Sequence, residues 1–213
     1  MTDLSIRLRQ AMQPWHTAPA WRIAFSGGLD SSVLLHLLAA WARDEELPAL
    51  SAIHVHHGLQ PAAGAWPEHC VQVCARLGIP LDIVRVQVAP GASLEQAAER
   101  ADAVLAELPP IDVLVLGMGE DGHTASLFPD SPNLEAALDP RGARRCLPMQ
   151  APSVPRQRLS MSLALLASAR LTLLALHGPG KLATLNQALA GESYEAMPIR
   201  AFLARPLEIY WCP

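Results

Sequence analysis

The sequence lacks a strong excess of charge of either sign. Its 213 residues include 16 Lys and Arg against 20 Asp and Glu, for a formal net charge of -4. A chain without a strong positive field does not hold a nucleic-acid backbone by itself, so we expect no stable complex with tRNA or DNA. The composition, 51% apolar and 17% charged, excludes a disordered chain and indicates a compact globular protein.

Long apolar runs and secretory signals are also missing. The longest apolar region, residues 159–176, is interrupted by five polar residues: Ser160, Ser162, Ser168, Arg170 and Thr172. It therefore falls short of the roughly 20 clean apolar residues of a membrane helix. No N-terminal stretch combines a charged start, an apolar middle and a small-residue cleavage site. We expect a cytoplasmic protein with no membrane partner.

Cysteine is scarce, with four residues in the whole chain. Cys70 and Cys74 could hold a metal from one helix face, but no second ligand pair stands at zinc-site spacing. A histidine cluster, His54, His56 and His57, has no acidic or cysteine ligand at a familiar distance either. We therefore expect small buried cysteines and no metal site, with the histidines lining a ligand crevice at a strand end.

A glycine-rich turn between two apolar runs organises the N-terminal half. Residues 21–25 predict a strand and residues 33–38 a helix, with the sequence SGGLDSS at 26–32 between them. Two glycines let the backbone approach a ligand, and the first helical turn offers free amides to an anion. The turn therefore predicts a phosphate site. An ordinary turn with a serine cap fits the spacing equally well.

Strands and helices alternate along the chain. We predict strands at 49–56, 81–88, 111–116, 146–149, 159–163, 171–177 and 207–211, and helices at 4–13, 31–43, 67–77, 93–108, 134–138 and 182–189. This alternation predicts a parallel sheet with right-handed crossovers. The expected fold is one α/β domain over residues 1–213, a three-layer doubly wound Rossmann-like sheet of order 3-2-1-4-5 with additional C-terminal strands. The turn at 26–32 and the loop at 117–126 would then face one crevice.

The first half resembles the N-terminal domain of tRNA(Ile)-lysidine synthetase, an ATP-pyrophosphatase of the PP-loop type. The similar segments are SGGLDSS at 26–32, HVHHGLQ at 54–60, and Trp66 with the pair His69-Cys70. The resemblance implies six residues that cradle the pyrophosphate of ATP: Ser26, Gly27, Gly28, Asp30, Ser31 and Ser32. It also implies that His54 and His56 lie near the adenine, and that Mg-ATP is a possible ligand.

From residue 102 to residue 213 the chain is similar to 6-phosphogluconolactonase instead. The matching segments are LGMGEDGHTASLFP at 116–129, CLPMQAPSVPRQRLSMSL at 146–163, GPGKLATL at 178–185 and LEIYWCP at 207–213. The resemblance implies that His123 is the general base that activates water against a lactone carbonyl, oriented by Asp121. It also implies that Arg158 and Lys181 contact the substrate phosphate.

Neither family pattern is complete. The synthetase pattern should continue into a loop rich in His and Asp for ATP and metal, and then into tRNA-binding domains. The lactonase pattern should begin with a Gly-rich loop ending in Thr-Pro and include an Asp-Glu-Arg loop for the substrate phosphate. Here those two positions read Leu29-Asp30-Ser31 and residues 54–60.

We therefore interpret the chain as an engineered recombination of two doubly wound folds, with halves 1–100 and 101–213 joined inside the helix at 93–108. It should keep a phosphate-binding crevice for a small phosphorylated ligand, require no cofactor, and lack efficient catalysis. Two alternatives stay open. One is retained hydrolysis of 6-phosphogluconolactone, and the other is an ATP-binding module in the first half.

Overall fold

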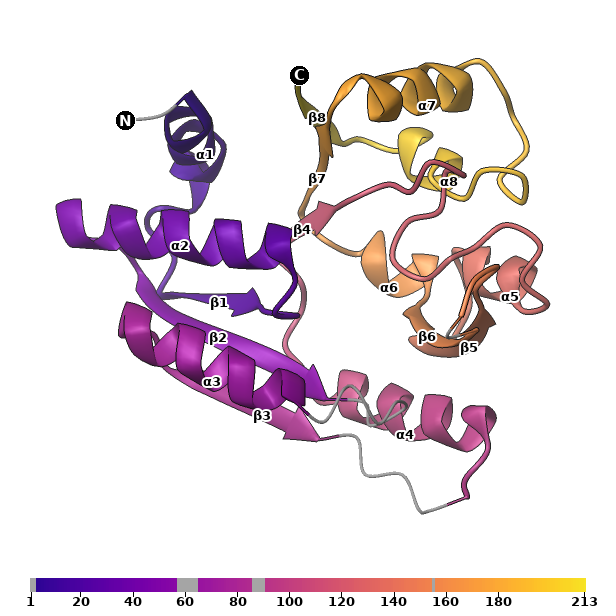
Figure 1. The fold of residues 1–213 in the computed structure, drawn as a ribbon, viewed down its shortest axis with the longest axis horizontal. Coiled ribbons are helices and arrows are strands. Elements are labelled where there is room, and N and C mark those ends of the chain that lie inside the picture. Colours follow the sequence, from indigo (N-terminus) through magenta and orange to yellow (C-terminus); the bar gives the residue numbers. More distant parts are fainter. Residues whose placement is uncertain (1–2, 57–64, 86–90, 155) are drawn as a thin grey trace. The chain divides into compact units, whose positions relative to one another are not determined.

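The computed structural model describes residues 3–56, 65–85, 91–154 and 156–213, without the side chains of Asp3, Leu29 and Asp30. The chain divides into two compact units, residues 1–86 and 87–213 (Figure 1). Whether the two units form the predicted single domain over residues 1–213 depends on how they are arranged, so this stays a prediction. No helix in the described ranges is long and apolar enough to cross a membrane.

Unit 1 is built on a three-stranded parallel sheet. Its elements in chain order are α1 (Asp3–Met12), the 3-10 turn η1 (Gln13–Trp15), β1 (Ala20–Ala24), α2 (Leu29–Asp44), β2 (Ala49–His56), α3 (Trp66–Leu77) and β3 (Leu81–Arg85). β2 lies between β1 and β3, and both pairs are parallel. The predicted 3-2-1 order is therefore confirmed for these strands. Residues 86–88 of the predicted third strand lie outside the described residues.

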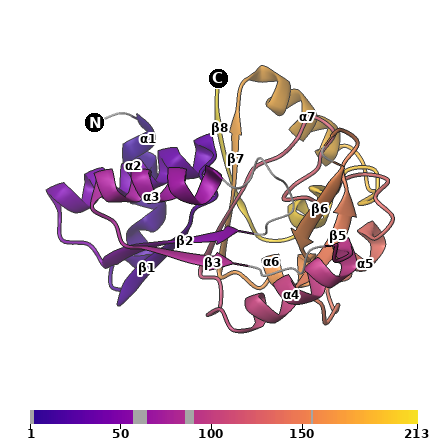
Figure 2. The same cartoon turned by 60° about the horizontal axis from the view of Figure 1, so that its bottom comes forward.

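Alternation along β1 explains why one face of this sheet is covered. Trp21, Ile23 and Phe25 are buried, whereas Arg22 faces the other way and pairs with Asp82 of β3. The indole of Trp21 lies 5.6 Å from that of Trp41 on α2. Figure 2 shows α2 and α3 on the same side of the sheet, as two right-handed crossovers in one direction require.

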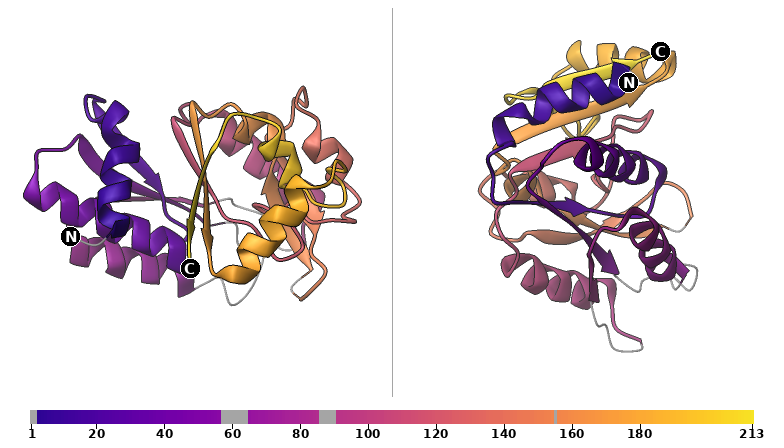
Figure 3. Two further views of the ribbon diagram at one scale, coloured as in Figure 1. Left: turned by 90° about the horizontal axis from the view of Figure 1, so that it is seen from above. Right: turned by 90° about the vertical axis from the view of Figure 1, so that its left-hand side faces the viewer.

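Unit 2 contains the remaining elements. They are α4 (Leu94–Ala106), β4 (Val113–Leu116), α5 (Leu134–Leu138), β5 (Cys146–Gln150), β6 (Gln157–Met161), α6 (Leu163–Leu166), β7 (Leu171–His177), α7 (Pro179–Leu189), α8 (Arg200–Leu203) and β8 (Glu208–Cys212). β4, β7 and β8 form a parallel sheet in that order. Figure 3 shows β7 and β8 side by side. Leu114 and Leu116 of β4 and Leu174 and Leu176 of β7 belong to one apolar core, which also includes Leu127, Leu163 and Phe202.

The predicted step from the fourth strand to the fifth is wrong. β5 pairs antiparallel with β6 in a separate two-stranded sheet, and β7 takes the place beside β4. The connection over residues 151–156 is too short for a parallel crossover and allows only a hairpin. The first and fourth strands, predicted to be neighbours, belong to different units, so their pairing stays a prediction.

The predicted strand at 159–163 ends two residues too late. β6 stops at Met161, because the Ser162 hydroxyl accepts the backbone N–H of Leu165 at 3.3 Å and caps the short helix α6. The helix predicted at 93–108 begins with a capping box. The Ser93 hydroxyl accepts the N–H of Gln96, and the Gln96 side chain accepts the N–H of Ser93.

Helix α4 is fastened to β5 by one carboxylate. Asp102 Oδ1 accepts the backbone N–H groups of both Arg145 and Cys146, the latter at 2.9 Å. Glu95, two turns earlier, pairs with Arg144. α4 therefore packs as part of unit 2. The predicted division into halves at residue 100 is a different boundary, and it stays a prediction.

Replacing Asp102 by Ala should leave two backbone donors without their charged acceptor. We expect Asp102→Ala to lower the free energy of unfolding by about 2–4 kcal/mol, measured by urea titration. Asp102→Asn keeps one acceptor oxygen in the same place and should cost about half as much. Equal stability of Asp102→Ala and the parent chain would show that α4 does not depend on this contact.

Candidate functional site

The loop at residues 26–32, called the SGG loop below, is held by hydrogen bonds from its own serine hydroxyls. The Ser26 hydroxyl lies 2.9 Å from that of Ser31 and accepts the N–H of Gly28 at 3.2 Å. The hydroxyls of Ser31 and Ser32 both donate to the Gly28 carbonyl, at 3.1 and 2.8 Å. Gly28 is the N-cap of α2 and receives no side-chain cap. The side chain of Asp30 lies outside the described residues.

Gly27 is held in a conformation that only glycine adopts easily. Its φ is +85°, and a Cβ built there would lie 3.0 Å from Cys70 Sγ and 3.1 Å from Trp66 Cε3. The SGG loop therefore packs directly on the first turn of α3. This close approach leaves no space for a side chain at position 27.

His54 lies in the core beneath this loop. It is 5% exposed, and its Nδ1 lies 2.9 Å from the carbonyl oxygen of Phe25. Because a carbonyl only accepts, Nδ1 carries the proton and Nε2 is left as an acceptor. That Nε2 has no hydrogen-bond partner within the described residues. His57 and the following residues to Gln60 lie outside the described residues.

Burial shifts the pKa values of three neighbouring side chains of unit 1 towards their neutral forms. Burial, with Arg85 and His54 nearby, lowers the pKa of His56. Burial raises the pKa of Cys70 to about 11 and also raises that of Cys74. Both cysteines are buried, as predicted, and protonated thiols are poor metal ligands. Among the residues that the structure describes, no group of three His, Cys, Asp or Glu side chains could hold a metal ion.

The second predicted centre is the loop that follows β4, residues 117–128, called the signature loop below. Its backbone folds back on itself, with Gly119 N–H donating to the His123 carbonyl at 2.8 Å and Gly122 N–H to the Gly119 carbonyl at 3.1 Å. The buried Thr124 hydroxyl donates to the Gly117 carbonyl at 2.8 Å. These bonds hold His123 at the end of a tight turn.

His123 and Asp121 form a direct pair. Asp121 Oδ1 lies 2.6 Å from His123 Nδ1 and accepts the His123 backbone N–H at 3.0 Å. The ring of Phe128 lies 4.4 Å from the imidazole. Because Nδ1 donates to the carboxylate, the neutral imidazole presents Nε2 as a proton acceptor. The arrangement suits a general base.

Asp121 is ionised over the whole neutral range. Its partial burial by itself would raise the pKa of the carboxyl, but the hydrogen bonds from the backbone N–H and the ring of His123 outweigh burial. The net effect is a pKa below the ordinary value for aspartate. The carboxylate is therefore available to orient the imidazole and to stabilise its protonated form.

Contacts from three distant segments hold the signature loop, and the sequence analysis found none of them. Ile199 N–H donates to the Gly122 carbonyl at 2.9 Å, and Ser126 N–H donates to Ser160 Oγ on β6 at 3.3 Å. Thr184 of α7 lies 3.5 Å from the carbonyl of residue 120. These are long-range contacts of common residue types, which leave no local pattern.

The two predicted phosphate contacts lie on elements that hold this loop. Arg158 is half-buried on β6, two residues before Ser160 and therefore on the same face of the strand. Lys181 lies in the first turn of α7, one turn before Thr184. Unit 2 thus carries both cations next to residues that fasten the signature loop. The predicted crevice shared with the SGG loop involves both units and stays a prediction.

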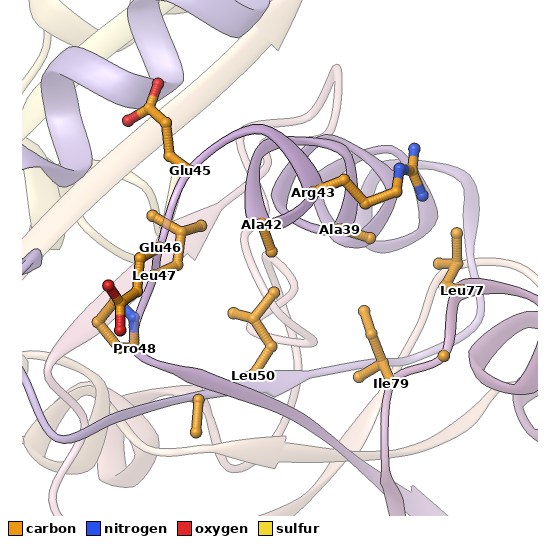
Figure 4. A pocket seen from close by; sticks show the side chains of 12 residues that line it. Ala39, Ala42, Arg43, Glu45, Glu46, Leu47, Pro48, Leu50, Leu77 and Ile79 are labelled. Carbon is orange, nitrogen blue, oxygen red and sulfur yellow. The ribbon is translucent and has the colours of Figure 1, made fainter.

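A pocket of about 390 Å³ lies elsewhere in unit 1 (Figure 4). Its walls include Leu50, Leu77 and Ile79, together with Arg43 in the last turn of α2 and Glu46 in the connection to β2. These residues lie at the amino end of β2, whereas the SGG loop follows the carboxyl end of β1. The pocket contains none of the predicted site residues.

These features define a Rossmann-like α/β protein with a carboxylate-supported histidine in a loop after a parallel strand. The chain belongs to the family of glucosamine-6-phosphate isomerases and 6-phosphogluconolactonase, whose model matches residues 64–211. The PP-loop domain model matches residues 1–105. Both resemblances predicted from the motifs are therefore confirmed, and the two matched ranges overlap in α3, β3 and α4.

Individual relatives divide in the same way. A 6-phosphogluconolactonase of Pseudomonas putida is 68% identical over 121 residues, which are 57% of this chain and 50% of that protein. A tRNA(Ile)-lysidine synthase of Pseudomonas syringae is 57% identical over 128 residues, which are 59% of this chain and 29% of that protein. The chain thus spans half or less of these relatives.

The solved structures extend the comparison to the fold. The crystal structure of a 6-phosphogluconolactonase from Shewanella baltica matches with a TM-score of 0.72 and 28% identity. The match covers 98% of this chain and 89% of that one. A 6-phosphogluconolactonase from Plasmodium vivax matches with a TM-score of 0.69 at 16% identity, which concerns the fold alone.

The space around Gly119 gives a direct test of the His123–Asp121 pair. A Cβ built on Gly119 would lie 2.1 Å from His123 Nδ1 and 2.6 Å from Asp121 Oδ1. We therefore expect Gly119→Ala to displace the imidazole and abolish the bond, seen as a changed His123 ring signal by NMR. Gly117→Ala is the matched control, because nothing lies within 4 Å of its Cβ. An unchanged His123 signal in Gly119→Ala would contradict the geometry.

Proposed function

We propose that the chain is an engineered recombination whose second half retains a weak hydrolytic centre for 6-phosphogluconolactone, without efficient catalysis. The observation that carries this proposal is the 2.6 Å contact between His123 Nδ1 and Asp121 Oδ1 in the signature loop. Membership of the sugar-phosphate family over residues 64–211 supports the same choice of substrate class.

The proposed reaction needs no cofactor. His123 Nε2 takes a proton from water as the water oxygen attacks the lactone carbonyl, and Asp121 stabilises the imidazolium that forms. The tetrahedral oxyanion then collapses and breaks the bond from the carbonyl carbon to the ring oxygen. His123 returns its proton to that leaving oxygen, so the net change is the addition of one water to give 6-phosphogluconate.

We expect turnover to be weak because one part of the phosphate-binding pattern is missing. The Asp-Glu-Arg loop of the lactonase pattern is replaced by residues of the synthetase pattern at 54–60. Arg158 and Lys181 would then be the cations that hold the substrate phosphate, the first by a bidentate fork and the second as a point charge. A displacement of about 1 Å between substrate and base costs about a hundredfold in rate.

A second candidate, binding of Mg-ATP, rests on the SGG loop. Gly27 at φ +85° precedes the 16-residue helix α2, whose first turns carry Ser31 and Ser32 and whose first amides suit a phosphate. We expect Mg-ATP to raise the melting temperature of the purified chain, and Asp30→Ala to remove that rise. Ser168→Ala, in unit 2, is the control. A melting temperature that Mg-ATP leaves unchanged would refute this candidate.

Substitution of the base tests the principal proposal. We expect His123→Ala to reduce hydrolysis of 6-phosphogluconolactone, measured above the spontaneous rate, by about 10²- to 10⁴-fold or to the background. His36→Ala removes an exposed histidine of α2 and should leave the rate unchanged. If the parent chain does not exceed the spontaneous rate, the chain is not a lactone hydrolase. If His123→Ala hydrolyses the lactone as fast as the parent chain, His123 is not the base.

A further inference from the structure

Arg200, at the start of α8, is fixed by three backbone carbonyls. Its Nε donates to the carbonyl of Ala188 at 2.9 Å and its Nη2 to that of Gln187 at 3.1 Å, both in the last turn of α7. Its Nη1 donates to the carbonyl of Ser193 at 2.9 Å. A Cβ on Gly191 would lie 2.1 Å from the guanidinium, so the group is closely packed. Arg200 therefore ties the C-terminal end of α7 to α8.

The residues just before Arg200 hold the signature loop. Ile199 donates its N–H to the Gly122 carbonyl at 2.9 Å, one residue before His123. Met197 packs on the same glycine, since a Cβ on Gly122 would lie 2.8 Å from the Met197 side chain. Both residues are buried. The segment from Met197 to Arg200 thus joins the loop of the base to α7.

The middle of α7 contacts the loop separately. The Thr184 hydroxyl donates to the Gly180 carbonyl at 3.1 Å and lies 3.5 Å from the carbonyl of Glu120. Lys181 lies between Gly180 and Thr184 in this turn. α7 is therefore connected to the signature loop from its middle, through Thr184, and from its C-terminal end, through Arg200.

We infer that Arg200 is a positioning residue, which fixes the separation between Lys181 on α7 and His123 in the signature loop. The inference rests on the proposed function, in which Lys181 contacts the substrate phosphate and His123 is the base. A guanidinium with three carbonyl partners holds two backbone segments rigidly, and an uncharged side chain of similar length cannot. Without it, the C-terminal end of α7 would keep its apolar contacts with this segment but lose these three hydrogen bonds.

This role has a consequence for specificity. The phosphate accelerates hydrolysis only if binding at Lys181 places the lactone carbonyl correctly for His123. Gluconolactone has the same ring without the phosphate and gains nothing from that spacing. The ratio of kcat/KM for 6-phosphogluconolactone to kcat/KM for gluconolactone therefore reports the position of α7 relative to the loop.

The experiment compares Arg200→Met with Arg200→Lys and the parent chain, with Arg205→Met as control. Arg205 follows α8 and donates to the carbonyl of Ala201 in that helix. We expect Arg200→Met to lower the substrate ratio by about tenfold or more, mainly through kcat, and Arg200→Lys to recover part of it. Arg205→Met should keep the parent ratio. An unchanged ratio in Arg200→Met would overturn the inference.

A second readout does not require turnover. The imidazole NMR signal of His123 should differ between Arg200→Met and the parent chain, both folded at the temperature of measurement, and should match the parent in Arg205→Met. An identical signal in all three overturns the positioning role. If the parent neither hydrolyses the lactone nor binds 6-phosphogluconate, the proposed function fails, and a shifted His123 signal in Arg200→Met still supports the positioning role.

Discussion

The hydrogen bond between the Asp121 carboxylate and the His123 imidazole is the constraint that fixes the geometry of the signature loop in unit 2. It exists because the backbone reverses over five residues, and that reversal needs an empty position at Gly119 and a positive φ at Gly122. The buried apolar core holds the strands, but the turn itself is held by single hydrogen bonds. The position of the His123 imidazole is therefore set by different contacts from those that stabilise the fold.

Sequence reasoning succeeded where the cause is local. The strand at 49–56 and the start of the helix at 93 follow from neighbouring residues, and the parallel order of the first three strands follows from the alternation of strands and helices. It failed at β5, where a short connection makes a hairpin instead of extending the sheet. It also missed Ile199, whose contact with Gly122 spans 77 residues, and Arg200, whose contacts span 7 to 13 residues, because neither set of contacts leaves a periodic pattern.

The overlap of the two family matches has a structural counterpart in α4. Both matches include this helix, and its polar contacts fasten it to the β5 edge of unit 2 through Asp102 and Glu95. A helix that satisfies two patterns needs apolar residues on the right face and correct caps, which are generic properties of a crossover helix. A carboxylate that accepts two backbone N–H groups is more specific. The origin of α4 is therefore better judged from its polar anchors than from its apolar face.

The close packing of Gly27 on α3 restricts where this chain could be joined to another sequence without disturbing the SGG loop. The glycine has no space for a Cβ because Cys70 and Trp66 lie against it. A breakpoint anywhere between residues 27 and 66 would give the loop a foreign steric partner, whereas one beyond residue 70 carries loop and partner together. The shortest segment that carries this loop with its steric partners is therefore not the seven-residue motif but the whole segment from the start of β1 through Cys70 of α3.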